Sequence, residues 1–132
     1  MRFLVMAMMT NEAAAGPPPK PEAFVAMQQY NEKAIKAGIL LAAEGLTPKG
    51  KRVEFDGDER TVRDGPFTET KEMVAGFMII KMDSMAEAIE WVKNAPFDPS
   101  NGKGVVEIRK LMDIEDFGPG FVANEEVAKI KY

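Results

Sequence analysis

Two stretches of the chain, FLVMAMM (residues 3–9) and VAGFMIIKM (residues 74–82), are apolar at both alternating positions. Successive side chains of a β-strand point to opposite faces, so a strand with this pattern is buried on both sides. Each face of the sheet that holds these strands must therefore be covered by another part of the chain or by another molecule.

Helical spacing of apolar residues predicts two helices to supply that cover. The first spans residues 21–37 and begins with Pro21, which suits the first position of a helix. The second begins at Ser84, where Ser84-x-x-Glu87 matches a capping box, and ends at Pro96. Further strands are expected at residues 39–46 and 104–112.

A β-hairpin is predicted between the second strand and the stretch at 74–82. Val53 and Phe55 alternate with charged residues before Asp56-Gly57, a strong signal for a hairpin turn. The order β, α, β, hairpin, β, α, β predicts an α+β protein with a ferredoxin-like βαβ(ββ)βαβ fold and an inserted hairpin. We expect this domain to span residues 1–112, with residues 113–132 as a C-terminal extension that ends in a short helix from Asn124.

Composition excludes several classes of function. The 132 residues include no histidine and no cysteine, which removes Ser-His-Asp and Cys-His catalysis, histidine-ligated metal sites and disulfides. The net charge of −4, without a basic run, argues against nucleic acid, and no apolar run is long enough to cross a membrane. No phosphate-binding loop, dinucleotide fingerprint or metal-ligand spacing occurs, so we expect no cofactor and no metal, and the absence of cysteine fits a cytoplasmic protein.

The doubly apolar strands also predict association. Two helices cover one face of the sheet, and the other face would be a large exposed apolar patch. Either the tail after Met112 folds over that face or a second subunit packs against it. A two-fold homodimer, sheet against sheet, is the simpler solution. Such a dimer would form a barrel that encloses a small cavity.

The sequence resembles the DGPF-type members of the YCII-related superfamily. The resemblance rests on DGPFTETKE (64–72), AGILLAAEGLTP (37–48) and GVVEIRKLM (104–112), and on VAGFMIIKMDSMAEAIEWV directly after the first of these. The tail segment EDFGPGF is similar to the extension of a longer subgroup. The resemblance covers residues 1 to about 112 and implies a dimeric α/β-barrel, in agreement with the burial pattern.

The resemblance implies little about chemistry. Some members of the superfamily are thought to be enzymes with a His-Asp pair, a mechanism that a chain without histidine cannot use. Some relatives occur beside or fused to sigma factors, which suggests a regulatory role for them.

The loop at residues 64–72 is the first candidate site. As a structural corner, Gly65 and Pro66 shape the backbone, Phe67 fills an apolar gap and Asp64 bonds backbone amides. As a site, the same loop carries charges of both signs at the edge of a rigid sheet. The candidate ligand-binding residues are Arg63, Phe67, Glu69 and Glu72.

Glu44 is the second candidate, because it lies in the otherwise apolar strand LLAAEGL. If it faces the cavity it is the leading proton acceptor, and Asp64 would organise the loop while Lys71 holds an anionic group of the substrate. Strand alternation does not choose between this face and solvent.

Besides a purely structural accessory role, two functions fit these residues. The first is a homodimer that binds a small organic molecule and performs cofactor-free acid–base chemistry. The second is a non-catalytic regulatory or protein-interaction module that contacts another protein through its charged loop and its tail.

Overall fold

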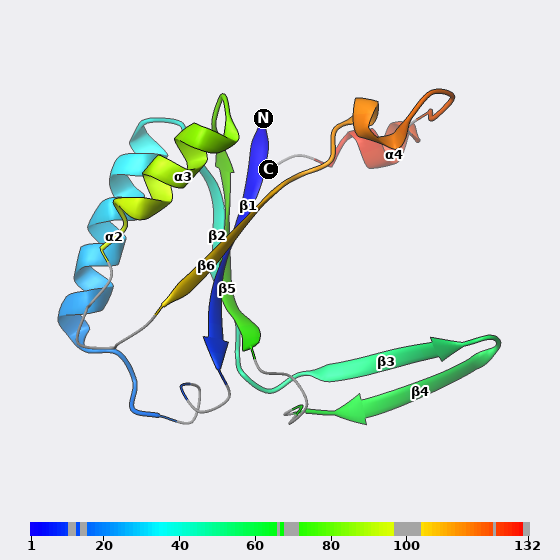
Figure 1. Cartoon of the computed structure of the whole chain (residues 1–132), viewed down its shortest axis with the longest axis horizontal. Coiled ribbons are helices and arrows are strands. Elements are labelled where there is room, and N and C mark those ends of the chain that lie inside the picture. The colour runs from blue at the N-terminus through cyan, green and yellow to red at the C-terminus, as the bar shows by residue number, and fades with distance from the viewer. Residues whose placement is uncertain are drawn as a thin grey trace.

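A four-stranded antiparallel sheet with the strand order β2-β5-β1-β6 forms the centre of the protein (Figure 1). The structure is a computed structural model and describes residues 1–10, 13, 16–65, 67, 72–96, 104–122 and 124–130. The two doubly apolar stretches occupy the two central strands, as their pattern requires. The strands are β1 (Arg2–Thr10), β2 (Leu40–Gly45), β5 (Glu72–Lys81) and β6 (Val105–Lys110).

Two helices, α2 (Pro21–Lys36) and α3 (Met85–Lys93), lie on the same side of this sheet (Figure 1). The predicted cap of α3 is present, because the Ser84 hydroxyl accepts a hydrogen bond from the amide of Glu87 at 3.2 Å. The Glu87 carboxylate accepts from the amide of Asp83, also at 3.2 Å, instead of from the Ser84 amide of a standard capping box.

The core lies between these helices and the sheet. Phe3 and Val5 of β1, Ile80 of β5 and Ala88 of α3 form one buried cluster, with Trp91 packed against it. Phe3 and Val5 are two residues apart, so they point to the same face of β1. This face is therefore the one that the helices cover.

The inserted hairpin forms a separate two-stranded sheet of β3 (Lys51–Asp56) and β4 (Glu59–Asp64). Its turn depends on Gly57, whose φ of 58° lies in the left-handed region that favours glycine. The prediction of a hairpin at Asp56-Gly57 is confirmed. Figure 1 shows the hairpin projecting from one end of the main sheet, away from the helices.

The C-terminal tail begins with a short 3-10 helix, η2 (Ile114–Phe117), and continues into α4 (Glu125–Ala128). The predicted start of α4 is confirmed, because the Asn124 side chain accepts hydrogen bonds from the amides of Glu126 and Val127. The tail lies at the end of the sheet opposite to the hairpin, and like the hairpin it lies on the side away from α2 and α3 (Figure 1).

The side of the main sheet opposite to α2 and α3, which we call the open face, follows from the strand register. Leu4 and Met6 alternate with the buried Phe3 and Val5, so they point away from the helices. Directly opposed residues of antiparallel strands share a face. The open face therefore also includes Ala42, Glu44, Phe77, Ile79, Glu107 and Arg109.

These features define an α+β protein built on antiparallel sheets. The order of its elements is the one predicted from the sequence and is compatible with a ferredoxin-like fold. No helix within the described residues combines the length and the apolar character that a membrane span requires.

Candidate functional site

The loop after the hairpin is a close-packed corner. The amide of Gly65 donates to the carbonyl oxygen of Gly50 at 2.8 Å, which joins the two ends of the hairpin. A Cβ on Gly65 would lie 2.8 Å from that oxygen and 3.1 Å from the ring of Phe67. Phe67 is half-buried, and the guanidinium of Arg52 lies 3.8 Å from the centre of its ring. The corner predicted from Gly65 and Phe67 is therefore present.

The charged residues at the hairpin base lie in exposed ion pairs. Asp64 lies 3.4 Å from the Lys51 ammonium, and both side chains are about three-quarters exposed. Arg63 lies 3.1 Å from the Glu54 carboxylate, on the hairpin itself. Exposed pairs of this kind contribute about 0–1 kcal/mol each, so they add little to the stability of the hairpin base.

The other predicted residues of this loop are placed differently. Glu72 is exposed at the start of β5, opposite Thr10 of β1. Glu69 and Lys71 lie outside the described residues. The structure thus brings together Arg63, Asp64 and Phe67 at the hairpin base.

Glu44 lies on the open face of β2, in a cross-strand row with Phe77 of β5, Met6 of β1 and Glu107 of β6. The side of the sheet to which Glu44 points depends on a register shift between Leu40 and Ala42. This shift reverses the alternation of inward and outward side chains within β2. Glu44 is exposed, and within the described part of the chain its carboxylate forms no ion pair or hydrogen bond. The open face therefore carries a carboxylate between apolar neighbours.

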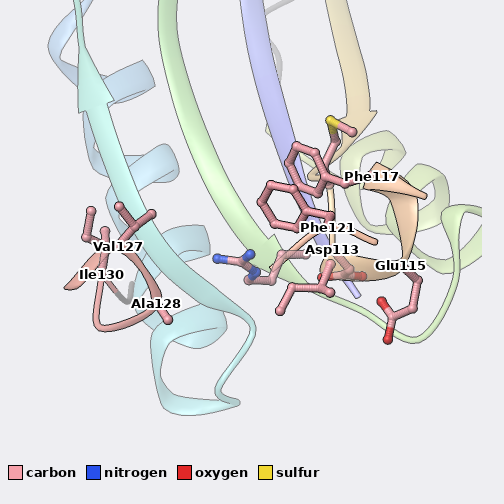
Figure 2. Close-up of a pocket in the computed structure, with 10 residues that line it drawn as sticks. Asp113, Glu115, Phe117, Phe121, Val127, Ala128 and Ile130 are labelled. Carbon is pink, nitrogen blue, oxygen red and sulfur yellow. The ribbon is translucent and has the colours of Figure 1, made fainter. Parts of the chain in front are cut away.

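A pocket of about 540 Å³ lies between the tail and the Arg2 end of the sheet. Phe117 and Phe121 stack on one side of it, with ring centroids 4.4 Å apart, and Val127 and Ile130 lie across from them (Figure 2). Arg2 also lines the pocket and is half-buried. None of the residues predicted as a site lines this pocket.

Sequence reasoning missed this pocket because the tail contacts β1, which is more than a hundred residues away in the chain. The available signal was the pair of phenylalanines around Gly118-Pro119-Gly120. Two large aromatic residues that flank a Gly-Pro-Gly turn indicate that the segment packs against something.

Lys110 fixes the start of the tail. Its ammonium lies 2.8 Å from the Asp116 carboxylate and 3.3 Å from that of Asp113. The hydrogen bond from Lys110 lowers the pKa of Asp116, and the same bond raises the pKa of Lys110. This ionic cluster holds η2 against the end of β6 and so positions Phe117 in the pocket wall.

No group of three or more aspartate or glutamate side chains in the described residues is arranged to hold an ion. The arrangement offers instead an open face whose apolar centre lies between two carboxylates, Glu44 and Glu107, and a pocket that contains one cation, Arg2, and two carboxylates, Asp113 and Glu115.

The fold and these two sites define a small α+β protein with an antiparallel sheet that is open on one side. The chain belongs to the YCII-related family, whose domain model matches residues 1–115. It is similar to an uncharacterised protein of Rhizobium meliloti (strain 1021), with 34% identity over 88 residues, which cover 64% of this chain and 69% of the relative. The resemblance seen in the sequence is thus confirmed at the level of the family.

Proposed function

We propose that the protein acts as a homodimer in which two open faces pack together and enclose a chamber for a small organic molecule. The observation that carries this proposal is the apolar character of the open face. Leu4, Met6 and Phe77 point away from both helices that cover the sheet. A second copy of the same face would remove these side chains from water, which is the driving force of most protein association.

The hairpin and the tail support the same arrangement. Both project on the open side of the sheet, one at each end, where they would flank a second subunit (Figure 1). In this dimer the C-terminal extension, residues 113–132, packs on the partner as well as on its own sheet.

Glu44 would supply the chemistry of the chamber. Its position between apolar neighbours in the row of Phe77 and Met6 is compatible with a proton acceptor once a second sheet removes solvent. Asp64, paired with Lys51, would keep the hairpin base in place beside it. The role of Lys71 as the holder of an anionic group rests on the sequence alone. The acid–base chemistry proposed for Glu44 would require no cofactor.

A regulatory or protein-interaction module is the second candidate, and the hairpin favours it. Val53 and Val62 are direct cross-strand partners, and both are more than half exposed. Phe55, two residues along β3 on the same face, is 71% exposed. This exposed apolar ribbon is a surface that a protein partner could cover.

The dimer is tested by the mass in solution, measured by size-exclusion chromatography with light scattering. We expect the mass of two chains for the wild type and of one chain for Met6→Glu, because a negative charge in the centre of the interface, in the same row as Glu44 and Glu107, would remain unpaired. The matched control is Ile35→Glu, which places the same charge at an exposed apolar position of α2 and should leave two chains. A wild-type protein with the mass of one chain would contradict the proposal.

The chamber is tested by a melting-temperature screen against small organic acids, phenols and amides. We expect some compounds to raise the melting temperature of the wild type, and Glu44→Gln to abolish the shift without changing the melting temperature of the free protein.

If a protein partner binds through the hairpin instead, Phe55→Ser will abolish that binding while Glu44→Gln leaves it unchanged.

A further inference from the structure

Three cationic side chains share the end of the open face that lies beside the tail. Arg2 and Lys81 are direct partners in the pairing of β1 with β5, and Arg109 lies opposite Leu4. Arg2 and Leu4 are two residues apart on one strand, so all three cations point to the same side. Lys81 and Arg109 are exposed, and Arg2 is half-buried in the wall of the tail pocket.

These positive charges are not neutralised within the described residues. Neither Arg2 nor its two cationic neighbours forms an ion pair or a side-chain hydrogen bond there. The carboxylates around them are Glu107 on β6, and Asp113 and Glu115 in the pocket wall. Asp113 is already bound by Lys110. A half-buried guanidinium that has no partner among the described residues favours binding of an external anion.

Beyond these charged groups, the wall of the pocket is apolar. The rings of Phe117 and Phe121 are stacked with an angle of 16° between their planes, yet they remain 50% and 45% exposed. Val127 and Ile130 of the α4 segment face them across the pocket (Figure 2). Small-molecule sites typically combine apolar walls with a few charged or polar groups, and a volume of about 540 Å³ is ordinary for such sites.

We propose that this pocket binds a small organic carboxylate with an aromatic or branched apolar body. The guanidinium of Arg2 binds the carboxylate through its fork of N–H donors, and Lys81 and Arg109 add long-range attraction. The apolar body lies between the phenylalanine stack and the Val127 side of the pocket. All of these groups belong to one chain, so the site is complete within a single chain and does not include Glu44.

The test compares naphthylacetate with its uncharged amide, naphthylacetamide, on the full-length protein. Calorimetry measures the affinity of each, and methyl NMR spectra locate the contact. We expect the acid to bind more tightly and to shift the methyl signals of Val127 and Ile130. Arg2→Gln should weaken binding of the acid about tenfold to hundredfold, the range for a hydrogen bond to a charged group, and should leave the amide unaffected.

Arg60→Gln is the matched control, since Arg60 lies on the hairpin and outside the pocket. It should leave both affinities unchanged. Phe121→Ala should weaken acid and amide alike, because it removes apolar contact and no charge. Equal affinity of the wild type for acid and amide, or an affinity for the acid that survives Arg2→Gln, would overturn the proposal. Binding that Glu44→Gln abolishes and Arg2→Gln does not would assign the ligand to the chamber instead.

Discussion

Gly65 shows how a single residue fixes the hairpin base. Its amide bonds the carbonyl oxygen of Gly50, and the space where a Cβ would stand is occupied by that oxygen and by the ring of Phe67. The sequence indicated a glycine needed for backbone freedom. The structure shows a different reason, because Gly65 is required for the close approach of two backbone segments.

Gly65→Ala should therefore destabilise the protein by about 1–3 kcal/mol, the usual cost of forcing extra volume into a packed site. Chemical denaturation measures this change in the free energy of unfolding. Gly50→Ala is the control, since a Cβ at Gly50 meets nothing within 4 Å. Equal free energies of unfolding for the two variants would show that the hairpin base accommodates the added methyl group without loss of stability.

At the scale of elements, a pair of aromatic residues joins the two helices. The ring centroids of Tyr30 on α2 and Trp91 on α3 are 4.7 Å apart, and the Tyr30 hydroxyl donates to the carbonyl oxygen of Trp91. Burial raises the pKa of Tyr30 to about 12. The neutral phenol is thus favoured in the folded state, while the unfolded chain releases the proton at about pH 10.

Because the pKa of Tyr30 is higher in the folded state than in the unfolded chain, its contribution to stability decreases at high pH. The contribution of Tyr30 to stability is complete below about pH 10 and is lost as the pH rises towards 12. In Tyr132→Phe, which leaves Tyr30 as the remaining tyrosine, we expect ultraviolet absorbance to report phenolate formation near pH 12 in the folded protein. In denaturant the midpoint should return to about 10. A folded-state midpoint near 10 would contradict the burial of this hydroxyl.

At the scale of the whole molecule, the tail is separate from the core. The buried core residues of the described chain are Phe3, Val5, Ala34, Ile79, Ile80 and Ala88, and all of them precede the tail. The tail adds an ionic cluster at Lys110 and an apolar pocket at Arg2. The described tail residues thus contribute none of the buried core residues.

Deletion of residues 113–132 should leave a protein that still unfolds cooperatively, because the sheet and both of its covering helices remain intact. Circular dichroism during heating tests this. A truncated chain without a cooperative transition would show that the tail belongs to the folding unit.

The sequence by itself determined the order of the elements, the two central strands, the hairpin and the cap of α3. Each of these follows from neighbouring residues, through the period of apolar side chains or the chemistry of a turn or cap. The family also followed from the sequence, because its motifs are contiguous.

Only the tertiary structure decided the face of Glu44 and the location of the pocket. The side to which Glu44 points depends on a register shift between Leu40 and Ala42, which arises from pairing with β5. The sequence of β2 alone does not reveal this shift. The pocket requires the tail to meet Arg2 at the other end of the chain. Local periodicity carries no information about contacts between such distant segments, since they form only when the whole sheet is assembled.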